Sequence, residues 1–218
     1  MPELKVAIID YEMGNLFSVK QACEFVGLIP LITCDKNEIL NSDALILPGV
    51  GAFGDAMQNL KKLNLITPIK EFINKGKPFM GICLGMQLLF SESEEFGLHK
   101  GLGIIDGRVV KFSQKNSKNI KVPQMGWNRI YKTDKTAWDN SPLYNVQPNQ
   151  FMYFVHSYYV TPSDNKHILS LTNYEGIEYC SGILYKNIFA IQFHPEKSAK
   201  DGLKIYYNWG KIISDFTF

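Results

Sequence analysis

The chain has 218 residues, of which 45% are hydrophobic and 20% are charged, and its formal net charge is +2. This length and composition can bury a substantial core, and they exclude a disordered chain, a collagen-like repeat and a coiled coil. Arg108 and Arg129 are the only arginines, and no apolar run approaches the roughly 20 residues of a membrane span, so we expect neither a nucleic-acid partner nor a membrane partner.

Strand and helix patterns alternate through the first hundred residues. The run 4–10 is almost continuously apolar and β-branched, which is typical of a strand covered on both faces of a parallel sheet. Helical spacing of apolar residues follows in 15–26 and ends at Gly27. We expect further strands at 28–33, 44–47 and 78–82, and helices at 54–62 and 67–75. This alternation predicts an open α/β sheet.

The pattern changes after residue 101. Strand-like segments joined by polar turns are expected at 107–112, 151–155, 167–172, 177–185 and 188–193, followed by a closing helix at 199–214. The polar stretches 113–121 and 133–149 are predicted to be surface loops. Because no repeat and no linker separates the two halves, we expect a single domain that spans residues 1–218.

The cysteines favour a reduced chain without a metal. The four cysteines are Cys23, Cys34, Cys83 and Cys180; they form no CxxC pair, and no histidine stands at zinc-ligand spacing beside one. The N-terminal residues also lack the layout of a secretion signal. We therefore expect a cytoplasmic protein that uses neither a metal nor another cofactor.

Cys83 is distinguished from the other cysteines by its neighbours. An apolar strand runs into Gly81-Ile82-Cys83-Leu84-Gly85, and an apolar helix is expected to follow at once. This is the pattern of a nucleophile elbow with sulfur in place of the serine oxygen. A buried structural cysteine is the alternative, but glycines on both sides of it serve core packing poorly. The pattern predicts a thiolate nucleophile at the carboxyl edge of the sheet.

A thiolate nucleophile needs a proton carrier, and His194 is the best source among the four histidines. An apolar strand ends at His194, and Glu196 follows two residues later. If the backbone stays extended through Pro195, both side chains point to the same side, and the carboxylate can orient the imidazole. A histidine in a surface loop is the alternative for His194 considered alone.

An acyl-transfer site also needs donors for an oxyanion. The backbone amide of Leu84 is one candidate. The other is the turn Gly49-Val50-Gly51 after the third strand, where glycines permit a close approach of the backbone. Taken alone, this second signal fits a plain turn equally well.

Together, Gly81-Ile82-Cys83-Leu84-Gly85-Met86-Gln87 and Gln192-Phe193-His194-Pro195-Glu196 resemble the class I (triad-type) glutamine amidotransferase family. The resemblance implies a flavodoxin-like α/β fold: an open sheet with a parallel core and antiparallel additions, flanked by helices. It implies that Cys83 attacks the side-chain amide of glutamine, that His194 carries the proton and that Glu196 orients His194. It also implies that substrate is contacted by Gln87, by the backbone of 49–51 and by the segment His156-Ser157-Tyr158.

Further segments, among them 10–16 and 125–128, are similar to one branch of this family, the glutaminase subunits that pair with a (βα)8-barrel cyclase of histidine biosynthesis. The resemblance implies a heterodimer, with Met125, Trp127, Asn128 and Lys197 at the interface and 125–128 as a docking loop. It also implies a glutaminase that is nearly silent until the partner holds its substrate, and we hypothesise that the backbone of 49–51 completes the oxyanion site only then. From the chain alone, Trp127 fits a core anchor and an interface anchor equally well.

One position departs from the branch's common pattern, because Gln124 stands where a histidine is usual. This departure leaves the ammonia acceptor open: a paralogue that aminates a surface-polysaccharide sugar is the alternative to the histidine pathway. Two further alternatives are a catalytically idle binding subunit of the same fold and a cysteine hydrolase of esters or peptides.

Overall fold

The computed structural model describes residues 3–113, 120–132 and 138–217. Their strands are β1 (Lys5–Ile9), β2 (Ile29–Thr33), β3 (Ala44–Leu47), β4 (Phe79–Ile82), β5 (Phe90–Ser93), β6 (His99–Lys100), β7 (Ile105–Lys111), β8 (Gln124–Ile130), β9 (Gln150–His156), β10 (Tyr158–Pro162), β11 (Ile168–Tyr174), β12 (Ile177–Tyr185) and β13 (Ile188–Ile191). Their α-helices are α1 (Leu16–Phe25), α2 (Lys36–Asn41), α3 (Phe53–Lys62), α4 (Ile66–Asn74), α5 (Leu84–Leu88) and α6 (Ala199–Thr217).

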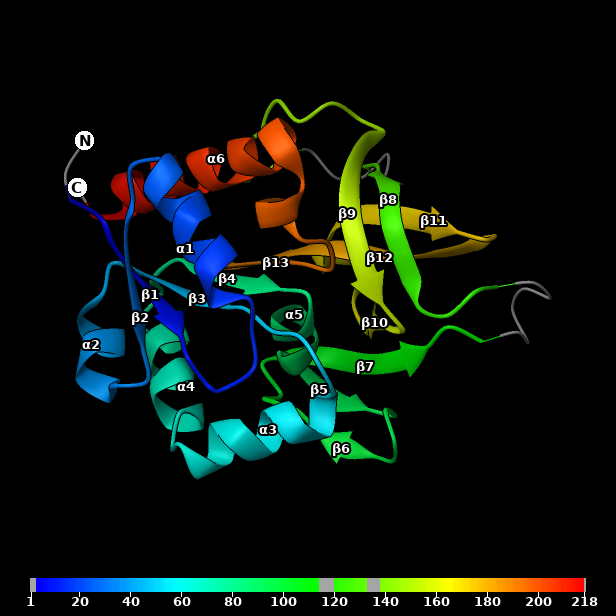
Figure 1. Ribbon diagram of the computed structural model, residues 1–218, viewed down its shortest axis with the longest axis horizontal. Coiled ribbons are helices and arrows are strands. Elements are labelled where there is room, and N and C mark those ends of the chain that lie inside the picture. Colours follow the sequence, from blue (N-terminus) through cyan, green and yellow to red (C-terminus); the bar gives the residue numbers. More distant parts are fainter. Residues whose placement is uncertain (1–2, 114–119, 133–137, 218) are drawn as a thin grey trace.

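Within these described residues, 11 strands form one mixed sheet. Its order is β2-β1-β3-β4-β13-β12-β10-β7-β5-β6, and β11 pairs with β12 outside this path. The neighbours from β2 to β13 are parallel, whereas β12 is antiparallel to β13 and to β10. The predicted parallel core with antiparallel additions is therefore present. Strands β8 and β9 form a separate antiparallel pair, which stands beside the sheet in Figure 1.

Helices cover both faces of the parallel strands. Figure 1 shows α1 and α6 on one face and α3 and α4 on the other. Strand β1 explains why both faces need cover: Val6 and Ile8 belong to the core under α1 and α6, whereas Ala7 and Ile9 belong to the core on the opposite face. A strand buried on both faces reads as a continuous apolar run, as predicted from residues 4–10.

The carboxyl ends of β3, β4 and β13 meet at one edge of the sheet because these three strands are adjacent and parallel. Residues 49–51 follow β3, Cys83 follows β4, and His194 comes three residues after β13. Segments that are far apart in the sequence are thus brought to one place. This edge is where ligands bind in open α/β sheets.

Two sequence expectations differ from the structure. The stretch 133–149 was expected to be a polar surface loop, yet its described part carries five buried residues, Trp138, Ser141, Pro142, Leu143 and Val146. The indole of Trp138 donates to the carbonyl of Leu169 at 2.8 Å. Anchors scattered in a polar sequence have no periodicity, and pattern reasoning therefore misses them. Residues 114–119 and 133–137 of the two predicted loops lie outside the described residues.

Several elements had no sequence signal: α2, β5, β6, β8 and β10 were not predicted. Helix α5 is the apolar helix expected after Cys83, and it has five residues before the chain continues into β5. Across the described ranges, we find no helix with the length and apolar character to cross a bilayer.

Candidate active site

Cys83 occupies a strained turn between β4 and α5. Its φ of 54° lies in the left-handed region that side chains rarely adopt. The turn is tight because α5 packs directly against β3: a Cβ atom on Gly85 would lie 1.8 Å from the carbonyl oxygen of Leu47. The backbone N–H of Cys83 donates to the carbonyl of Ile191 at 2.8 Å, which ties the turn to β13. This geometry is that of the predicted elbow.

His194 and Glu196 form a buried pair beside this turn. Nδ1 of His194 lies 2.8 Å from Oε1 of Glu196, and the two side chains are 3% and 1% exposed. An extended backbone was expected between them, but Pro195 begins a short 3₁₀ turn over Pro195–Lys197. The turn still brings the carboxylate back onto the ring. The hydroxyl of Ser198 donates to the His194 carbonyl at 2.6 Å and holds the turn closed.

The charges around His194 favour its protonated form. Burial acts to lower the pKa of His194, but the sulfur of Cys83 and the carboxylate of Glu196 outweigh burial and raise it above its ordinary value. Part of the effect of the sulfur is a hydrogen bond between the side chains of His194 and Cys83, so the two groups lie next to each other. Among the described residues, Nε2 of His194 has no nitrogen or oxygen partner, and it is the sulfur of Cys83 that it faces. That nitrogen is therefore available to a reacting group.

The turn after β3 is held from below by Tyr11. The Tyr11 hydroxyl donates to the carbonyl of Pro48 at 2.7 Å, and a Cβ atom on Gly49 would lie 2.2 Å from that hydroxyl oxygen. Gly51 has a φ of 98°, and Val50 is 40% exposed. The turn is thus anchored at its start, while its tip reaches the space above Cys83.

A cavity of about 350 Å³ opens at Cys83. Its volume suits a small amino acid. All the predicted substrate-contacting residues line it except Gly49, which lies beneath it. The lining residues are Val50, Gly51, Cys83, Leu84, Gln87, Glu95, Pro123, Val155, His156, Ser157 and Tyr158.

Sequence reasoning missed three of the lining residues, Pro123, Val155 and Glu95, of which Glu95 carries a charge. Its Oε2 accepts from the backbone N–H of Phe53 at 2.6 Å, and burial raises the pKa of its carboxyl. The only available signal was its place in a charged stretch, which is typical of a solvated surface. The structure instead brings a carboxylate to the rim of the cavity.

His156 is unsuited to carry a proton at neutral pH. Burial lowers its pKa to about 3, and both ring nitrogens already have partners. Nδ1 lies 2.9 Å from the carbonyl oxygen of Tyr158, and Nε2 lies 3.2 Å from the hydroxyl of Tyr179. That hydroxyl also lies 2.9 Å from the amide of Gln124. The unusual Gln124 is therefore buried behind the cavity and is not part of the exposed face of β8.

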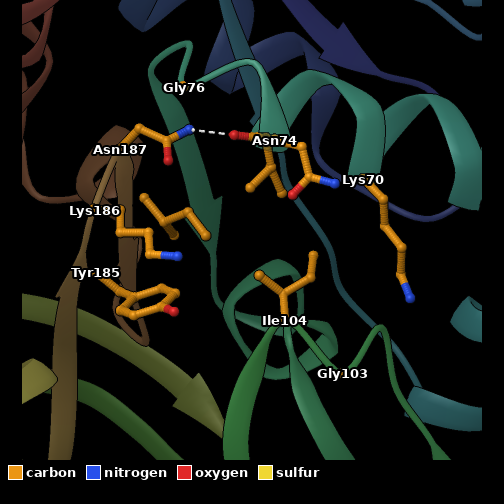
Figure 2. A pocket seen from close by; sticks show the side chains of 10 residues that line it. Lys70, Asn74, Gly76, Gly103, Ile104, Tyr185, Lys186 and Asn187 are labelled. Carbon is orange, nitrogen blue, oxygen red and sulfur yellow. Dashed lines mark hydrogen bonds between the residues drawn. The ribbon is translucent and has the colours of Figure 1, made fainter.

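A second, larger cavity of about 610 Å³ lies at the amino ends of β4 and β13. Figure 2 shows Lys186 and Tyr185 of the β12–β13 hairpin facing α4 across it. Its lining contains no cysteine, histidine or carboxylate. It lies at the opposite edge of the sheet from Cys83, and its lining lacks the groups that acyl transfer needs.

Three of the four predicted interface residues share one face, and those between 125 and 128 belong to a strand and not to a loop. Met125, Trp127 and Asn128 belong to β8, which pairs with β9 so that Trp127 lies opposite Tyr153. Met125 and Trp127 are 67% and 55% exposed. Nζ of Lys197 lies 6.0 Å from the Tyr153 ring centre, next to Trp127. The amide of Asn128 points instead to β11, where it donates to the Asn173 carbonyl at 2.9 Å.

Known proteins resemble this chain over almost its whole length. A sequence profile of the family "Glutamine amidotransferase class-I" matches residues 7–210. The chain is 47% identical over 207 residues to the imidazole glycerol phosphate synthase subunit HisH of Sulfurimonas denitrificans, covering 94% of this chain and 97% of that protein. It is 45% identical over 215 residues to HisH of Aquifex aeolicus, covering 98% and 100%.

Solved structures share the fold at lower identity. The structure of PurLQS from Thermotoga maritima superposes with a TM-score of 0.73 at 19% identity, covering 96% of this chain and 99% of that one. A glutamine amidotransferase from the same organism gives a TM-score of 0.59 at 17% identity, covering 100% and 87%. At this level of identity the likeness shows the fold alone.

Proposed function

The chain belongs to the class I glutamine amidotransferase family, and we propose that it is the glutaminase subunit of an imidazole glycerol phosphate synthase. The observation that carries the glutaminase part is the strained Cys83 beside the His194–Glu196 pair, at the floor of a cavity the size of an amino acid. The histidine-pathway part is supported by relatives named HisH that are 45–47% identical over almost the whole chain.

In the proposed reaction, the sulfur of Cys83 attacks the carboxamide carbon of glutamine. The carbon–nitrogen bond breaks, protonated His194 gives its proton to the departing nitrogen, and ammonia leaves a γ-glutamyl thioester. Loss of the anionic sulfur removes a group that raises the pKa of His194, so the proton is released when it is needed. Water then attacks the thioester, His194 takes its proton, and glutamate leaves the regenerated thiolate.

The backbone N–H groups at Leu84 and at the tip of 49–51 are proposed to hold the oxyanion of both tetrahedral intermediates. Tyr11 anchors the base of that turn, and the exposed Val50 leaves its tip free to adjust. Gln87 is less available than expected: its Nε2 already donates to the Tyr158 carbonyl at 2.9 Å and to Oε1 of Gln192 at 3.0 Å. Its carbonyl oxygen is the atom left for substrate.

We expect Glu95→Gln to raise KM for glutamine about tenfold with little change in kcat, because a charge-assisted hydrogen bond is worth roughly 1.5–3 kcal/mol. The carboxylate lies at the cavity rim, where it would face the α-ammonium group of glutamine. Glutamine at position 95 can still accept from the Phe53 N–H. The neighbouring Glu94→Gln is the matched control, because Glu94 does not line the cavity. The measurement is steady-state glutaminase kinetics. An unchanged KM for Glu95→Gln would contradict the binding of the α-ammonium group by Glu95.

The partner proposed for the chain is the (βα)8-barrel cyclase subunit, docked on the face formed by Met125, Trp127 and Lys197. This face lies beside Cys83 and carries two large exposed apolar side chains. Such a patch marks an interaction surface, and aromatic anchors dominate the affinity of interfaces. A cytoplasmic location belongs to the same proposal, since all four cysteines are unpaired.

Reconstitution tests the assignment. With the histidine-pathway cyclase, the chain should support glutamine-dependent formation of imidazole glycerol phosphate, and Trp127→Ala should weaken the complex about 30-fold in a calorimetric titration. Phe216→Ala is the matched control: Phe216 is 52% exposed but lies on α6. Stimulation of a sugar-aminating partner, without activity on the cyclase, would favour the paralogue that aminates a polysaccharide sugar.

A further inference from the structure

Gln192 is a fully buried polar residue that touches the sulfur of Cys83. It is 0% exposed, does not line the cavity, and places its Nε2 atom 3.6 Å from Sγ. Two further groups lie against the sulfur: the imidazole of His194, which hydrogen-bonds to it, and the carbonyl oxygen of Val155, at 3.9 Å. That carbonyl can accept from a neutral thiol but repels a thiolate. An N–H donor on the same sulfur has the opposite effect, because hydrogen bonds to a charged form stabilise it.

The amide of Gln192 can present either nitrogen or oxygen to the sulfur, and its neighbours decide which. The Tyr158 carbonyl only accepts, so the atom of Gln87 that lies 2.9 Å from it must be the amide nitrogen. The same nitrogen lies 3.0 Å from Gln192 and donates its second hydrogen there. The atom of Gln192 that receives it must be the oxygen. The nitrogen of Gln192 is therefore turned towards Cys83.

His156 holds the starting point of this chain of hydrogen bonds. Its Nδ1 donates to the same Tyr158 carbonyl at 2.9 Å, so both lone pairs of that oxygen are used. The ring stays neutral, and its Nε2 lies 3.2 Å from the Tyr179 hydroxyl, which donates its hydrogen to Oε1 of Gln124. The hydrogen bonds that His156 and Gln87 make to the Tyr158 carbonyl are both buried, and buried hydrogen bonds favour one arrangement of the groups they join. The carbonyl cannot easily turn away and release Gln87.

We propose that Gln192 is a further catalytic residue, which donates an N–H to the sulfur of Cys83 and stabilises the reactive thiolate, with its amide held in that sense by Gln87 and the Tyr158 carbonyl. The use of this thiolate in glutamine hydrolysis rests on the proposed function. The effect of Gln192 on the pKa of the sulfur does not, because it is measurable without glutamine. The other titratable groups around the sulfur are His194, Glu196, His156, Glu95, Tyr11 and Tyr179. None of them is changed in the test.

The test is the pH dependence of iodoacetamide alkylation of Cys83 in the full chain. Every variant carries Cys34→Ser, because Cys34 is exposed and would react, and Cys83→Ala supplies the background rate. Replacing the amide by a thioether of similar length, Gln192→Met, should raise the pH of half-maximal alkylation by about one unit. The rate measured below that pH then falls about tenfold. Gln192→Glu, of the same shape, should raise the pH of half-maximal alkylation further, because a carboxylate repels the thiolate.

Ser181→Ala is the matched control: Ser181 is a buried polar residue on the neighbouring β12, and its hydroxyl lies 3.1 Å from that of Ser170. Its half-maximal pH should equal that of the parent. If Gln192→Met and Gln192→Glu, folded by circular dichroism, also keep the parent value while losing glutamine hydrolysis, Gln192 only supports the structure and the proposal is wrong. If Gln192→Met does not fold, the Gln192→Glu profile decides alone. If the parent complex has no glutaminase activity, the proposed function is wrong, but the effect of Gln192 on the alkylation of Cys83 still stands.

Discussion

Cys83→Ala is expected to reduce glutamine hydrolysis by roughly 10⁴-fold or more, because no thioester can form without the sulfur. The ammonium-driven reaction of the assembled complex should persist, since it bypasses the thioester. The side chain is small and 5% exposed, so the fold should tolerate its loss. The measurement compares glutamate release with product formation from added ammonium, in the presence of the cyclase.

Cys34→Ala is the control for this experiment. Cys34 is the exposed cysteine; it follows β2, at the same edge of the sheet as Cys83 but three strands away, and its replacement should leave both rates unchanged. Full glutamine turnover by Cys83→Ala would end the assignment of the nucleophile. A parent protein that never hydrolyses glutamine, alone or with its partner, would instead support the idle binding subunit. Turnover of esters without turnover of glutamine would support the hydrolase of esters or peptides.

The positions of Cys83 and His194 could be predicted because each follows a strand whose apolar run is unmistakable. Strand ends of a parallel core collect at one edge, so two short local patterns imply one site. The orientation of Glu196 was predicted for the wrong reason. An extended backbone was expected, whereas the 3₁₀ turn begun by Pro195 makes the contact.

Glu95 and the network around Gln192 could not be predicted, since their roles depend on contacts between distant segments. Gln87 and Gln192 are 105 positions apart, and neither shows from its neighbours which way its amide will face. From the sequence, Gln124 was only a departure from the branch's common pattern; the structure places it on the buried side of β8, with Met125 on the exposed side. Alternation along a strand assigns such faces only once the strand itself is recognised.

Gly85→Ala is expected to destabilise the protein by about 3 kcal/mol or more and to lower Tm by about 6–12 °C. The added Cβ would lie 1.8 Å from the Leu47 carbonyl oxygen and 2.8 Å from its carbon. Both are backbone atoms of β3, which is paired on both sides and cannot move aside. Helix α5 must therefore shift, and Cys83 at its start moves with it. Loss of glutaminase activity should exceed the loss of folded protein.

Gly210→Ala separates this clash from the general effect of adding a methyl group to a helical glycine. Gly210 lies within α6, and its added Cβ would meet only the flexible side chain of Leu28, at 3.4 Å. Alanine is about 1 kcal/mol better than glycine inside a helix, so Tm should rise by about 2–4 °C. Thermal melts of the two variants should thus move in opposite directions. If Gly85→Ala instead melts with the parent and keeps its activity, α5 does not depend on close contact with β3, and the tight turn is not what holds Cys83 at the cavity.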